Sequence, residues 1–171
     1  MTGWPLRTAS SPKERTTAAR ARDLPKKPVY LLGAAAATTH MNIVAMADLT
    51  QTAAIDSGRR AFEMAGLAPR DMDLVELYDA FTINTILALE DLGFCAKGEG
   101  GAFVSGGRIA PGGLLPVNTN GGGLSCVHPG MYGIFLLIEA ATQLRRRFGH
   151  AHIGGAPRGR QHGTRCRADT F

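Results

Sequence analysis

Residues 74–93 of this 171-residue chain read LVELYDAFTINTILALEDLG, and this stretch decides the fold class. The run LVEL, residues 74–77, is short and apolar, which is typical of a buried strand. The residues after it predict a helix that ends at Gly93, with an apolar face formed by Phe81, Ile83, Ile86, Leu87 and Leu89. A strand that passes into a helix through a tight turn indicates an α/β protein.

The alternation of strands and helices continues on both sides of this stretch. Residues 28–32, PVYLL, predict a buried strand, and residues 52–66 predict a helix that stops at Gly66 after a cap at Asp48 or Thr50. Further along, residues 114–118 predict a strand, residues 117–130 a glycine-rich turn and residues 131–147 a long helix. We therefore expect an α/β or layered αβα fold, and 171 residues suit a single domain.

The net charge of +5 is unevenly distributed along the chain. Residues 1–27 carry seven Lys/Arg against two acids, and residues 145–171 carry seven Arg against one acid. The centre, residues 28–144, carries five Lys/Arg against eleven acids, so a uniform nucleic-acid-binding face is not expected. Both basic tails lack apolar periodicity and are expected to be disordered.

Neither a secretory signal nor a membrane-spanning run is evident, because the apolar runs are too short. Cys95, Cys126 and Cys166 have no CxxC spacing, so neither a disulfide framework nor a zinc site is expected. A reducing, cytoplasmic setting is the default expectation.

Two turns join a predicted strand to a predicted helix and carry polar side chains, the usual place for a site in layered α/β proteins. In residues 117–130 the glycines Gly121–Gly123 allow a ligand or another backbone to come close, and Pro129 fixes the chain after His128. Simpler alternatives exist for each of these residues. His128 and Cys126 could have only structural roles, and the glycine run could bind a phosphate, although it matches the known phosphate-binding motifs poorly.

In the other turn, the alternatives are equally simple. Tyr78 and Asp79 suit a turn and a helix cap, since aspartate readily caps helices. Phe81 is expected in the core.

Two segments together resemble the C-terminal domain of thiolases, in the branch related to lipid-transfer-protein and sterol-carrier-protein thiolases: ELYDAFTINTILALEDLGFCAKGEGGAFV (76–104) and PVNTNGGGLSCVHPGMYGIFLLIEAATQLR (116–145). The resemblance implies a layered αβαβα half. It covers about residues 20–147, so the expected organisation is a basic tail (1–20), a thiolase-like C-terminal domain (21–147) and a second basic tail (148–171).

The resemblance also implies roles for residues. Residues 78–81, YDAF, stand where thiolases have an Asn-Glu-Ala-Phe or His-Asp-Cys-Phe loop that holds a catalytic water or polarises the substrate carbonyl. Val127-His128-Pro129 stands where the family has Gly-His-Pro, whose histidine deprotonates the nucleophilic cysteine and contributes to the oxyanion hole. The catalytic residues expected are thus His128 and Tyr78. Support is expected from Asp79, Asn120, Cys126 and Tyr132, and substrate binding from Phe81, Gly122 and Gly123.

Several departures from the family pattern shape the expected function. In the family, the nucleophilic cysteine belongs to the N-terminal half. A second family cysteine lies in a Cys-x-Gly motif, which Cys166-Arg167-Ala168 does not match. The composition change at both boundaries suggests a truncated or frame-disrupted reading frame. Tyr78 differs chemically from the family's amide or imidazole and leaves the reaction open.

The main expectation is a C-terminal fragment of an acyl-CoA acyltransferase, inactive without the other half, with acyl-CoA or CoA as substrate and neither cofactor nor metal. One alternative is a thiolase-like aldolase that cleaves β-hydroxyacyl-CoA of steroid side chains and works with a small OB-fold partner. Another is a non-catalytic domain that binds lipid or a thiolase partner. A lone half would expose apolar surface, so homo-oligomers or pairing with an N-terminal half are expected.

Overall fold

Parts of the N-terminal tail have regular structure. The structure, a computed structural model, describes residues 6–8, 11–13, 16–26, 28–126, 131–147 and 166–168, and the chain divides into units 1–30 and 31–171. In the first unit, β1 (Leu6–Thr8) pairs antiparallel with β2 (Ser11–Lys13), and α1 (Ala18–Ala21) follows. Disorder throughout this tail is therefore not confirmed, and residues 148–165 of the other tail lie outside the described residues.

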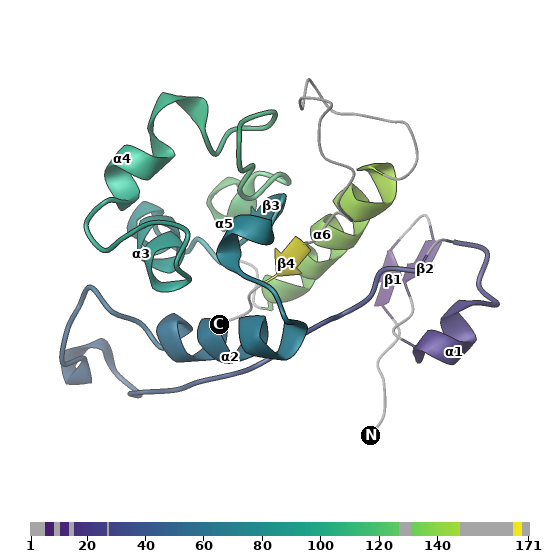
Figure 1. Cartoon of the computed structure of the whole chain (residues 1–171), viewed down its shortest axis with the longest axis horizontal. Coiled ribbons are helices and arrows are strands. Elements are labelled where there is room, and N and C mark those ends of the chain that lie inside the picture. Colours follow the sequence, from purple (N-terminus) through teal and green to yellow (C-terminus); the bar gives the residue numbers. More distant parts are fainter. Residues whose placement is uncertain are drawn as a thin grey trace. The chain divides into compact units, whose positions relative to one another are not determined.

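A short parallel pairing lies at the centre of the second unit (Figure 1). The strand β3 (Leu74–Glu76) pairs with β4 (Cys166–Ala168), and Val75 forms an isolated parallel bridge with Val117. The strand predicted over 74–77 is thus confirmed, whereas the one predicted over 114–118 is reduced to this bridge. A mixed α/β structure is confirmed at this level.

Helices and short helical turns surround this centre. They are α2 (Ala54–Ala65), α3 (Thr82–Asp91), α4 (Gly100–Val104), α5 (Gly122–Ser125) and α6 (Gly133–Arg147), with the 3₁₀ turns η1 (Ile43–Ala45), η2 (Pro69–Asp71) and η3 (Ser105–Gly107). The long helices match the predicted ranges closely. Their apolar faces enclose a core formed by Ala54, Phe62, Met72, Val75, Leu77, Ala88, Leu89, Leu92, Leu115 and Val117.

The helix α2 shows how local sequence sets a boundary. It ends where Gly66 adopts a left-handed conformation with φ of 64°, as its glycine predicts. Its start differs from the prediction, because the residue before the first turn is Ala53 and Asp48 instead accepts a hydrogen bond from the N–H of Thr50 at 2.8 Å. Neither Asp48 nor Thr50 is the N-cap.

The prediction of a buried strand over residues 28–32 is wrong. These residues form no strand, and Leu31 and Leu32 are 72% and 53% exposed. The predicted apolar face of α3 also needs correction, since Phe81 and Ile83 are 65% and 52% exposed while Leu89 is fully buried. Burial depends on a neighbouring surface, which an apolar pattern alone does not supply.

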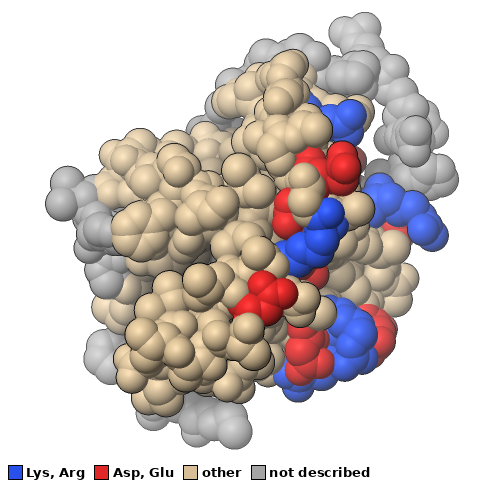
Figure 2. All heavy atoms as spheres, turned by 90° about the vertical axis from the view of Figure 1, so that its left-hand side faces the viewer, with Lys and Arg blue, Asp and Glu red and all other residues tan. Residues whose placement is uncertain are grey.

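The charged side chains form mixed groups in the described residues. Figure 2 shows a face on which acidic and basic side chains intermingle in one band while a broad area carries no charge. On α2, for example, Arg59 pairs with Asp56 and Glu63 at 2.8 and 2.9 Å. Within the described residues, no helix has the length and apolar character to cross a membrane, and no cluster of three or more His, Cys, Asp or Glu could hold a metal.

Candidate active site

Two loops that are far apart in the sequence meet where β3 and the Val117 segment end. The N–H of Asn118 donates to the carbonyl of Val75 at 2.9 Å, and the N–H of Leu77 donates to Asn118 Oδ1 at 2.7 Å. Because the two segments run parallel, their carboxyl ends lie at the same edge. The loop 77–81 and the loop 118–123 are thereby joined into one candidate site.

Asp79 connects the two loops directly. Asp79 is 4% exposed. Its Oδ1 accepts a hydrogen bond from the N–H of Gly123 at 2.5 Å, and its Oδ2 accepts one from the N–H of Leu124 at 3.5 Å. Free N–H groups at the start of a helix are satisfied by such a side chain. The alternative that Asp79 caps the helix following it is therefore wrong, because its carboxylate instead caps the start of α5.

The glycines of the second loop make room for this carboxylate. Gly122 has φ of 71°, and a Cβ built there would overlap with Asp79 Oδ2, while one at Gly123 would lie 3.0 Å from Asp79 Oδ1. The open space predicted at these positions is thus taken up by another part of the same protein. Substrate binding by Gly122 and Gly123 stays a prediction, since the structure gives both glycines a packing role.

Tyr132 is buried behind the second loop. It is 2% exposed, and its hydroxyl donates to Asn120 Oδ1 at 3.1 Å, the same oxygen that accepts the N–H of Gly122 at 2.9 Å. Burial raises the pKa of Tyr132 to about 12, so its hydroxyl stays protonated near neutral pH. Tyr132 is thus a fixed hydrogen-bond donor that holds Asn120.

Tyr78 lies beside Tyr132 at the same place. The ring centroids are 6.1 Å apart with an interplanar angle of 51°, and Tyr78 is half-buried. The ring of Phe135 on α6 also packs near Tyr132, with the two ring centroids 5.8 Å apart. The structure therefore brings Tyr78, Asp79, Asn120 and Tyr132 together.

Three further residues predicted for the site are not placed in this group by the structure. Phe81 directly precedes α3 and is largely exposed, so its expected place in the core is wrong. Cys126 follows α5 and is exposed as a free thiol. His128 lies outside the described residues, and its catalytic role remains a prediction.

Sequence reasoning missed a buried group beneath this site. Glu76 is fully buried, and its Oε1 accepts a hydrogen bond from the N–H of Thr119 at 3.1 Å and lies 2.7 Å from the hydroxyl oxygen of Thr119. A glutamate inside an otherwise apolar strand, LVEL, is the feature that pointed to it. A buried carboxyl rarely occurs without a specific partner.

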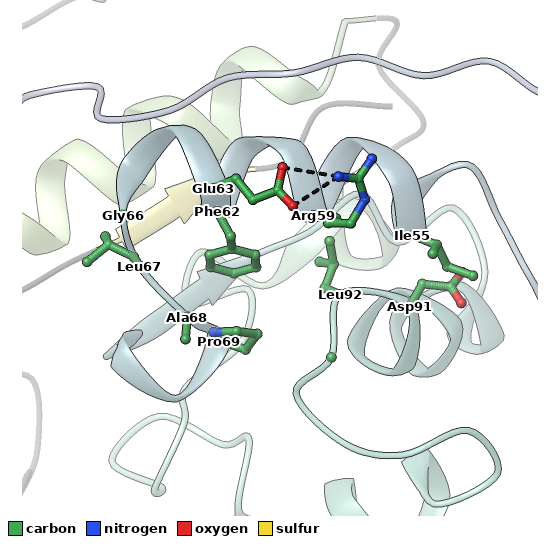
Figure 3. Close-up of a pocket in the computed structure, with 11 residues that line it drawn as sticks. Ile55, Arg59, Phe62, Glu63, Gly66, Leu67, Ala68, Pro69, Asp91 and Leu92 are labelled. Atoms are coloured by element: carbon green, nitrogen blue, oxygen red, sulfur yellow. Dashed lines mark hydrogen bonds and ion pairs between the residues drawn. The ribbon is translucent and has the colours of Figure 1, made fainter.

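An open apolar groove lies elsewhere, along α2 and beside the C-terminal end of α3 (Figure 3). Its volume is about 450 Å³, and it is lined by Ile55, Arg59, Phe62, Glu63, Gly66, Leu67, Ala68, Pro69, Asp91, Leu92 and Gly93. The ion pair between Arg59 and Glu63 borders it. Of the residues predicted for catalysis or substrate binding, those that the structure describes do not contribute to this groove.

The chain belongs to the thiolase C-terminal domain-like family, whose profile matches residues 35–166. It is 42% identical over 144 residues to an acetyl-CoA acetyltransferase of Methanothermobacter thermautotrophicus, covering 83% of this chain and 38% of that protein. It is 40% identical over 108 residues to sterol carrier protein 2 of Oryctolagus cuniculus, covering 63% and 20%.

A solved structure agrees with this assignment. The Ltp2-ChsH2(DUF35) aldolase superposes with a TM-score of 0.66 at 34% identity, covering 75% of this chain and 34% of that one. The chain therefore spans well under half of the length of each of these relatives.

Proposed function

We propose that this chain supplies the C-terminal, acyl-CoA-binding part of a thiolase-like acyltransferase, of the acetyl-CoA acetyltransferase or lipid-transfer type. The observation that carries the proposal is the junction of loops 77–81 and 118–123 through Asp79, in a chain whose sequence matches the thiolase family over 35–166. The substrate would be an acyl-CoA or CoA thioester.

The proposed chemistry divides the work between two halves. A thioester carbonyl needs a thiolate to attack it and hydrogen-bond donors to stabilise the oxyanion that forms. In the proposal, His128 is the base and a donor to the oxyanion, and the nucleophilic cysteine comes from an N-terminal half. Asn120, held by Tyr132, would keep the loop that leads to His128 in place.

An N-terminal half or a second copy of this chain is the proposed partner. The second unit exposes large apolar side chains that a lone soluble domain usually covers: Leu31, Leu32, Met41, Ile43, Val44 and Leu49. Burying these side chains against a second protein surface would favour association of this chain with the N-terminal half or with a second copy.

A second candidate is a thiolase-like aldolase that cleaves β-hydroxyacyl-CoA, together with a small OB-fold partner. Two observations favour it: the phenol of Tyr78 at the junction of the loops, and the likeness to the Ltp2-ChsH2(DUF35) aldolase. In this reaction Tyr78 would transfer a proton. Tyr132 is less suited to that task because its pKa is raised to about 12.

The test is a thiolysis assay and a retro-aldol assay on the purified chain, alone and mixed with a thiolase N-terminal domain. We expect activity only in the mixture and its loss with His128→Ala. Tyr78→Phe separates the candidates, because it should abolish retro-aldol turnover and leave thiolysis largely intact. Absence of both activities in every mixture would contradict both and favour a non-catalytic domain that binds lipid or a partner.

A further inference from the structure

Thr119 lies between two carboxyl groups from different elements. Its Oγ1 is 2.7 Å from Glu76 Oε1 on β3 and 2.8 Å from Glu139 Oε1 on α6. A hydroxyl carries one hydrogen, so Thr119 donates to only one of them. The other contact is a hydrogen bond only if that carboxyl group carries a proton and donates it to Thr119 Oγ1.

The surroundings assign this proton to Glu76. Its side chain is fully buried, and its Oε2 has no hydrogen-bond partner among the described residues. Glu139 is only half-buried and also accepts a hydrogen bond from Gln143 Nε2 at 2.6 Å. A buried negative charge with an unpaired oxygen is far more costly than a neutral carboxyl group in the same place.

With the proton on Glu76 Oε1, every contact has one donor and one acceptor. Glu76 donates to Thr119 Oγ1, and Thr119 donates to Glu139 Oε1, which also accepts from Gln143. Glu76 Oε1 still accepts the N–H of Thr119 at 3.1 Å. The chain of hydrogen bonds links β3, the loop 118–123 and α6.

We propose that Glu76 is a positioning residue whose bound proton joins β3 to the loop 118–123 and to α6, and so holds the two loops of the site together. This inference rests on the proposed function only in assuming that the loops 77–81 and 118–123 form the acyl-CoA site. It predicts that the junction of the loops loosens when Glu76 ionises.

The negatively charged groups around Glu76 also favour its protonated form. Burial is the largest cause that raises the pKa of Glu76, to about 7. The hydrogen bonds with Thr119 lower this pKa, and the charges of Glu139 and Asp79 raise it further. Tyr132 beside α6 is neutral over this range because its own pKa is about 12. On β4, Ala168 is the register partner of Glu76, and the charged Arg167 pairs with Val75.

The sign of the pH effect follows from these values. An unfolded glutamate has its ordinary pKa near 4.5, so folding takes up a proton between about pH 4.5 and 7. Stability contributed by Glu76 is complete below about pH 4.5 and is lost as the pH rises to about 7. Across pH 5–8 we expect the Tm of the full chain to fall by about 5–10 °C.

The experiment measures Tm of the purified chain from pH 5 to 8, and follows the side-chain carboxyl of Glu76 and the amides of Leu77 and Asn120 by NMR. We expect all three groups to titrate with one midpoint near 7. Glu76→Gln should flatten the pH dependence, whereas the matched variant Glu63→Gln, on the exposed face of α2, should retain it. None of these measurements needs turnover, so failure of the proposed function leaves them interpretable.

Variants of Thr119 separate positioning from a purely structural role. Thr119→Ser keeps the hydroxyl and should preserve the common midpoint, whereas Thr119→Val should leave Glu76 titrating without a response at Asn120. A Glu76 midpoint below pH 5 overturns the proposal. So does an Asn120 amide that does not follow Glu76, or an unchanged pH dependence in Glu76→Gln.

Discussion

Residues 31–32 and residues 74–75 have almost the same composition, Leu-Leu and Leu-Val, but opposite environments. Leu31 is 72% exposed and belongs to no strand, while Val75 is 1% exposed and contacts neighbouring segments on both sides. The N–H of Val75 donates to Pro116 and its carbonyl accepts from Asn118. Apolar residues become a buried strand only when other segments satisfy their backbone groups.

The exposed segment, residues 31–37, nevertheless lies along α2 within the second unit (Figure 1). A Cβ built at Gly33 would overlap with the carbonyl oxygen of Ala61, so the two backbones approach closely there. Arg60 also donates a hydrogen bond to the carbonyl of Ala36. The backbone of this segment is thus anchored, while the side chains of Leu31 and Leu32 are exposed.

The largest test of this comparison places a charge in each segment. Val75→Asp buries an unpaired carboxylate and should destabilise the chain by about 4 kcal/mol or more. Leu31→Asp, at an exposed position, should change stability by no more than about 0.5 kcal/mol. Urea denaturation of both variants measures the difference, and equal losses would show that residues 31–32 are buried in solution.

A smaller effect is expected from the close approach at Gly33. Gly33→Ala forces the segment away from α2 and should cost about 1–3 kcal/mol, the usual range for overpacking. The control is Gly101→Ala in α4, where a Cβ meets nothing within 4 Å. Thermal denaturation should show a loss only for Gly33→Ala, and a neutral result there would mean that the segment does not contact α2.

The smallest effect concerns Arg60, whose side chain is 44% exposed. Arg60→Ala should lower Tm by no more than about 1 °C, since exposed ion pairs contribute little. Hydrogen exchange of residues 34–37 should nevertheless become faster. Arg59→Ala removes ion pairs that lie within α2 and should leave exchange in 34–37 unchanged. The same acceleration in both variants would contradict the proposed anchor.

The candidate site could be predicted in part. Its family motifs pointed to Tyr78, Asp79, Asn120 and Tyr132, and the structure brings these four together. The partner of Asp79 could not be predicted, because it caps a helix that starts more than forty residues later. The roles of His128 and the other proposed site residues remain predictions.

The sequence by itself determined the elements whose causes are local. Gly66 ends α2 because glycine readily adopts a left-handed conformation, and the apolar periodicity of residues 131–147 produces α6. Only the tertiary structure decided which apolar runs are buried and where polar groups find partners. Val75 is covered and Leu31 is not, and Glu76 contacts Thr119, which also contacts Glu139. These outcomes depend on segments distant in sequence.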